Sequence, residues 1–99
     1  MSRASTERRL FDVAQRLRRA REELAVVDEQ LAALADAADD AHLRSLVSET
    51  PLAQRELADA RRHADAMVRT RRMVADRITE LARTQDELLD KLVAGVEQA

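Results

Sequence analysis

The segment Ser48-Glu49-Thr50-Pro51 separates two long stretches of sequence, and Pro51 is the only proline in the chain. Proline cannot continue a helix but fits its first turn, and the residue before it is driven out of the helical conformation. Thr50 is therefore a natural N-cap for a helix that starts at Pro51. The sequence predicts a first helix over about residues 5–47, a tight turn at 48–50 and a second helix over about 51–95.

Apolar residues recur at alternating spacings of three and four on both sides of this turn, as the a and d positions of a coiled-coil heptad do. In the first stretch these positions are Leu10, Val13, Leu17, Ala20, Leu24, Val27, Leu31, Leu34, Ala38 and Ala41. In the second stretch they are Leu57, Ala60, Ala64, Met67, Arg71, Val74, Ile78, Leu81, Gln85, Leu88 and Leu92. Arg71 and Gln85 are polar exceptions, and we interpret them as residues that set the register of the seam.

The turn and the charge pattern support the same antiparallel pairing of the two stretches. A turn centred on Glu49 places Leu17 opposite Leu81, and in this register each a position meets a d position. Residues 22–49 hold eight acidic residues and one arginine, whereas residues 50–77 hold seven arginines and four acidic residues. Opposite charges along two helices favour one orientation and register, although each exposed pair adds little stability.

The sequence therefore predicts an all-α fold, a long antiparallel two-helix coiled-coil hairpin that forms a single domain over residues 1–99. Abundant alanine, leucine, glutamate and arginine with almost no helix breakers are typical of such proteins. The alternative is a three-helix arrangement with a break near Asp36–Asp40, where two adjacent aspartates weaken the helix.

Composition argues against an enzyme, a metal site and a membrane span. The chain has no cysteine, and His42 and His63 lie in no metal-ligand spacing. No nucleophile–base pair, acid–base pair or glycine-rich phosphate loop is visible, so we expect no catalytic residue and no cofactor. No apolar run approaches the ~20 residues of a membrane span, and no apolar segment follows the polar residues 1–9. We therefore expect a cytoplasmic protein.

A second apolar stripe lies outside the predicted seam, mostly in the C-terminal half. A two-helix seam leaves this stripe uncovered, so the sequence predicts self-association into a four-helix bundle or contact with another protein's helix or groove. We interpret Leu43, Leu46, Val47 and Leu52, beside the turn, as a small apolar cap in preference to a docking tip. The residues expected at the partner interface are Phe11, Val68, Met73, Ala75, Ala82, Leu89, Val93 and Val96.

The acidic segment Asp36-Ala37-Ala38-Asp39-Asp40-Ala41 resembles the DxxDxA pattern at the coiled-coil tip of a family of RNA polymerase secondary-channel regulators. That family also carries a four-cysteine zinc site, which this sequence lacks. The three aspartates also lie before the predicted turn and not at it. We interpret the segment as an acidic face in contact with solvent, and as a possible contact segment in the second hypothesis below.

The leading functional hypothesis is a coiled-coil adaptor that dimerises and binds another protein of unknown identity. The alternative is a small regulator that binds a nucleic-acid machine such as RNA polymerase through the hairpin. Arginine stripes motivate this alternative, but without aromatic residues for stacking on bases we expect most arginines to pair within the hairpin. A secreted helical hairpin with a tryptophan–glycine turn ranks last, because that signature is absent.

Overall fold

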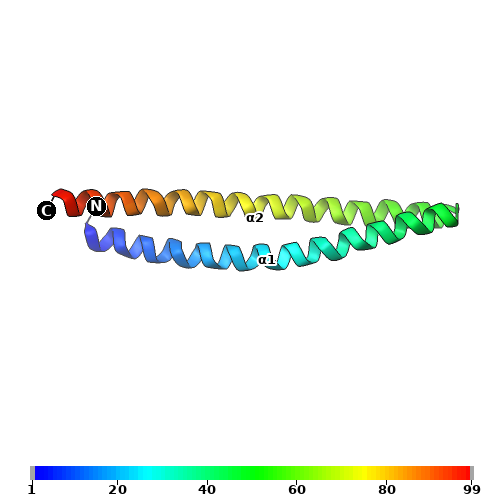
Figure 1. The fold of residues 1–99 in the computed structure, drawn as a ribbon, viewed down its shortest axis with the longest axis horizontal. Coiled ribbons are helices and arrows are strands. Elements are labelled where there is room, and N and C mark those ends of the chain that lie inside the picture. The colour runs from blue at the N-terminus through cyan, green and yellow to red at the C-terminus, as the bar shows by residue number, and fades with distance from the viewer. Residues whose placement is uncertain (1, 99) are drawn as a thin grey trace. The chain divides into compact units, whose positions relative to one another are not determined.

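A computed structural model describes the backbone of residues 2–98 and the side chains of residues 2–95. The described chain consists of two helices, α1 (Arg3–Val47) and α2 (Pro51–Gln98), with no strand (Figure 1). This confirms the predicted all-α helical hairpin. Helix α1 continues without interruption through the Asp36–Asp40 segment, so the three-helix alternative is wrong. Within residues 2–98 neither helix holds a stretch long and apolar enough to cross a membrane.

The turn is held by hydrogen bonds at both of its ends. At the end of α1, the Ser48 amide donates a hydrogen bond to the Arg44 carbonyl at 2.9 Å. At the start of α2, the Ala53 amide donates to the Thr50 hydroxyl at 3.1 Å, which is the N-cap bond expected of this threonine. Pro51 occupies the first helical position, where a missing amide proton costs nothing.

The start of α1 has a cap of its own. The Ser5 amide donates a hydrogen bond to the Ser2 hydroxyl at 3.1 Å, and the Thr6 amide donates to the Ser2 carbonyl at 3.0 Å. These bonds extend α1 back to Arg3, before the predicted start near residue 5. Helix α2 likewise continues beyond residue 95, to Gln98.

The chain divides into two compact units, each of which contains a segment of both helices. Unit 2 comprises Leu24–Met73 and includes the turn. Its seam contains the buried side chains of Val27, Ala41, Ala53 and Leu57. The buried Ser45 hydroxyl donates a hydrogen bond to the His42 carbonyl at 2.7 Å, so its polar group is satisfied inside the helix.

Unit 1 comprises Met1–Glu23 and Val74–Ala99. Leu17, Val74 and Leu88 are at most 2% exposed and form the most completely buried part of its seam. Fully burying a side chain of this size contributes about 1.5–3 kcal/mol relative to leaving it in water. The prediction that residues 1–99 form one domain is not settled by this division and stays a prediction.

The heptad accounts for the burial pattern in both units. Every predicted a and d residue is buried or half-buried except Arg71, whose exposure follows from its charged head group. The buried Thr6 and Ser45 extend the same spacing at the ends of α1. The a and d positions of both helices are thus covered within the described residues, apart from Arg71.

Candidate interaction surfaces

Two ion pairs cross from one helix to the other and define the sides of the seam. In unit 2, Arg71 Nε lies 2.5 Å from Asp28 Oδ1, the neighbour predicted for its outward-turned head group. In unit 1, Arg77 Nη1 lies 2.8 Å from Glu23 Oε2. Glu23 and Arg77 each directly precede an a position, so both are g positions of their heptads. In unit 1 the g positions of both helices therefore share one side of the seam. The e positions must then share the other side.

The e side of unit 1 carries large apolar side chains that nothing in the described chain covers. Phe11 is 66% exposed, Leu89 is 43% exposed and Val93 is 56% exposed. Ala75 and Ala82 lie on the same side and are half-buried beside the seam. We call these residues the unit 1 face, together with Ala14 at the e position of α1: Phe11, Ala14, Ala75, Ala82, Leu89 and Val93.

The remaining residues predicted for the partner interface lie outside unit 1 or outside the described side chains, and their role stays a prediction. Val68 and Met73 belong to unit 2 and are 42% and 65% exposed. They are five positions apart on the helix, which turns their side chains to different sides of α2. The side chain of Val96 lies outside the described residues. Gln85, predicted to set the register, is half-buried in the seam of unit 1.

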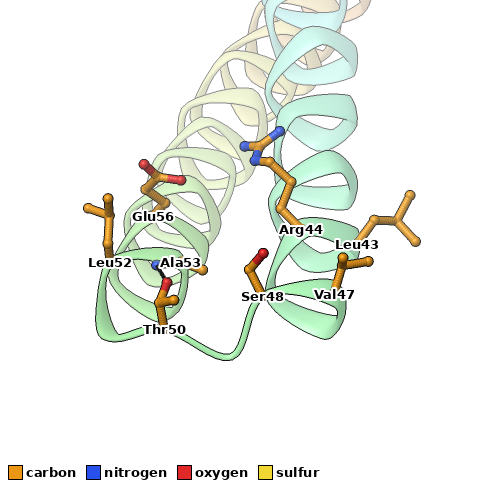
Figure 2. Close-up of a pocket in the computed structure, with 8 residues that line it drawn as sticks. All are labelled: Leu43, Arg44, Val47, Ser48, Thr50, Leu52, Ala53 and Glu56. Atoms are coloured by element: carbon orange, nitrogen blue, oxygen red, sulfur yellow. Dashed lines mark hydrogen bonds between the residues drawn. The ribbon is translucent and has the colours of Figure 1, made fainter.

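The turn end of unit 2 carries a second apolar surface. Leu43, Leu46, Val47 and Leu52 are 60–86% exposed, so they do not cover one another and the predicted apolar cap does not form. A shallow hollow of about 400 Å³ lies between the helices at this end. Figure 2 shows Leu43 and Leu52 on opposite sides of this hollow, one from each helix.

Polar groups of the turn line the same hollow. Ser48 and Thr50 lie along its lower edge in Figure 2, and Arg44 and Glu56 flank it on α1 and α2. The Thr50 hydroxyl is already engaged as the N-cap acceptor of the Ala53 amide. In the sequence, the leucine and valine residues on both sides of Ser48-Glu49-Thr50 indicated an apolar surface at the turn. Its openness to solvent was not expected.

The acidic segment lies on the outside of α1 in unit 2. Asp36, Asp39 and Asp40 are exposed, and within the described residues none of them forms an ion pair. Asp36 and Asp40 are one helical turn apart, so both point to the same side of α1. The segment therefore presents net negative charge to solvent.

Groups that perform chemistry are dispersed in the part of the chain that the structure describes. No three histidine, aspartate or glutamate side chains gather there in a way that could hold a metal ion. Both histidines are exposed, and His42 Nδ1 lies 3.4 Å from Arg61 Nη2. Among the described side chains no buried polar atom lacks a hydrogen-bond partner. The candidate interaction surfaces are the unit 1 face, the turn-end hollow and the acidic segment.

Comparison with known proteins gave no relative: no family model, no curated protein and no solved structure matches this chain.

Proposed function

We propose that this protein is a non-enzymatic coiled-coil interaction module that dimerises and binds another protein. The observation that carries the proposal is the unit 1 face, where Phe11, Leu89 and Val93 remain 43–66% exposed beside a completed seam. Single exposed apolar residues are normal on any protein surface, but a contiguous group at helical spacing is typical of an interface. A cytoplasmic location is part of the proposal, and cell fractionation tests it.

Paired helices in each unit support this role by holding the exposed apolar side chains beside the seam. A helix-in-groove or bundle contact uses apolar anchors at i, i+3, i+4 and i+7. Leu89 and Val93 of α2 supply the i and i+4 anchors of that spacing, and Ala82 lies seven residues before Leu89. The proposed site residues are those of the unit 1 face, with Arg71 and Gln85 fixing the register of the scaffold. No cofactor has a place in the proposal.

A pull-down from lysate of the native host, treated with nuclease, tests binding to another protein. The bait is the tagged chain, compared with a Leu89→Gln/Val93→Gln variant and with Val26→Gln as the matched control. Val26 is 52% exposed and belongs to α1 of unit 2, so it is not a residue of the unit 1 face. The proposal predicts that one protein is recovered at comparable amounts with the wild type and the control and is lost with the double variant. Equal recovery with all three baits contradicts it.

The second candidate is a regulator that binds a nucleic-acid machine such as RNA polymerase. The exposed and unpaired Asp36, Asp39 and Asp40 favour it, because an acidic segment on a helical arm can contact a basic channel. In the same pull-down, recovery of polymerase subunits that depends on these aspartates supports this candidate. The test variant is Asp36→Asn/Asp39→Asn/Asp40→Asn, and polymerase recovery that is unchanged by it overturns the role of the segment.

A further inference from the structure

We propose that the occupant of the unit 1 face is a second copy of this chain, with the α1 segment of one copy against the α2 segment of the other. This rests on the proposed function and specifies the geometry of its dimer; the other protein then binds the assembled dimer, so a variant that loses the dimer also loses that protein. In this arrangement the two-fold axis runs along the helices, and four helix segments form a bundle. Both helix segments of unit 1 contribute residues to the face, Phe11 and Ala14 from α1 and Leu89 and Val93 from α2.

The size of the face fits a weak contact with a second copy. At a rise of about 1.5 Å per residue, its residues span about 27 Å along α2, from Ala75 to Val93, and about 5 Å along α1, from Phe11 to Ala14. Pairing two such faces buries less than the roughly 1,200 Å² at the lower limit of the range for specific stable complexes. We therefore expect a reversible dimer that dissociates on dilution.

Charge selects which segments lie against each other. Residues 1–23 hold seven arginines and four acidic residues, whereas residues 74–99 hold six acidic and three basic residues. If the α1 segment of one copy lies against the α2 segment of the other, all four neighbouring pairs in the bundle join segments of opposite net charge. In the alternative, antiparallel hairpins place α1 against α1 and α2 against α2, so two of the four neighbouring pairs are repulsive.

Side-chain size is consistent with the same arrangement. A two-fold axis along the helices keeps each residue at its own level, and Glu23 and Arg77 show which residues share a level in unit 1. By that relation Phe11 comes beside Leu89 of the other copy, and Ala14 comes within about 6 Å of the level of Ala82, at a rise of about 1.5 Å per residue. The small pair allows the helices to approach, and the large pair next to it fills the space between them.

Cysteine cross-linking tests this geometry directly, because the chain has no cysteine of its own. Ala14→Cys and Ala82→Cys are prepared as separate variants, mixed under reducing conditions so that subunits exchange, and then oxidised. The proposal predicts a covalent dimer linked through positions 14 and 82 in the mixed sample. Each variant alone should give only the background yield of a Val26→Cys control in unit 2.

The outcomes separate the geometry from the proposed function. If Ala14→Cys alone or Ala82→Cys alone cross-links to itself more efficiently than the mixture, the antiparallel arrangement is correct and this proposal is overturned. If sedimentation shows dimers but no sample cross-links above the control, the unit 1 face is not the dimer surface. If the chain sediments as a monomer at the highest soluble concentration, no second copy binds. Protein binding in the pull-down then remains as a separate result.

Discussion

Arg71 of α2 donates a hydrogen bond through Nε to Asp28 Oδ1 of α1 at 2.5 Å, and this ion pair crosses the seam of unit 2. Arg71 occupies a heptad position that is otherwise apolar, so its aliphatic stem packs in the seam and its head reaches outward. Both side chains are nearly half exposed, at 44% and 47%. The pair is therefore better suited to fixing the register of the helices than to stabilising them.

A double-mutant cycle measures the strength of this pair. We expect Arg71→Ala, Asp28→Ala and the double variant to give a coupling free energy of about 0–1 kcal/mol, because solvent screens both groups. The measurement is urea unfolding at low and at high salt, and the coupling should shrink at high salt. A coupling of several kcal/mol that is insensitive to salt contradicts this interpretation.

Truncating the seam of unit 1 should cost far more than any surface change. Leu88 is 1% exposed, and Leu88→Ala is expected to lower the free energy of unfolding by about 2–5 kcal/mol. The matched control is Val26→Ala at a 52% exposed position, which should change it by less than about 0.5 kcal/mol. Chemical denaturation followed by circular dichroism gives both values. Similar losses for the two variants would show that the seam is misplaced.

Removing the cap at the start of α2 should weaken the turn. Thr50→Ala eliminates the hydroxyl that accepts a hydrogen bond from the Ala53 amide, at an expected cost of about 0.5–2 kcal/mol. Thr50→Ser keeps the acceptor and should retain most of the stability. Thermal unfolding of the two variants tests this difference, and equal melting temperatures would argue against the capping role.

Gly95 offers a substitution that should raise helix content. An added Cβ at Gly95 would meet nothing within 4 Å, and alanine is favoured over glycine in a helix by about 1 kcal/mol. Because this position is close to the end of α2, we expect Gly95→Ala to contribute no more than that. Circular dichroism should show a small gain in helicity, and the converse change, Ala94→Gly, should show a loss. A loss of helicity in Gly95→Ala would contradict the open space around this residue.

The seam was predictable from sequence because heptad periodicity is a local property. Leu17 and Leu88 follow a spacing that requires no knowledge of the other helix, and Thr50-Pro51 marks the turn by backbone chemistry alone. The Asp28 partner of Arg71 followed once the turn fixed the register. These features depend only on residues close in sequence and on the antiparallel register that the turn sets.

The exposed surfaces were harder to predict because the heptad pattern does not determine which residues outside the a and d positions are covered. Sequence placed Leu43 and Val47 near the turn, but whether apolar side chains cover one another at a helix end depends on the direction in which each leaves the helix. Met73 belongs to an apolar stretch by sequence, yet helical rotation turns it away from Val68. What covers the unit 1 face depends on a second molecule. A single chain therefore shows only that the apolar side chains of this face are exposed.

Sedimentation equilibrium over a wide range of protein concentration tests the central claim most directly, that the unit 1 face is an interaction surface. The wild type and the Val26→Gln control are predicted to shift together from monomer to dimer as concentration rises. The Leu89→Gln/Val93→Gln variant is predicted to remain monomeric at concentrations where the control is dimeric. A wild type that stays monomeric throughout, or a double variant that dimerises as well as the control, would contradict the claim.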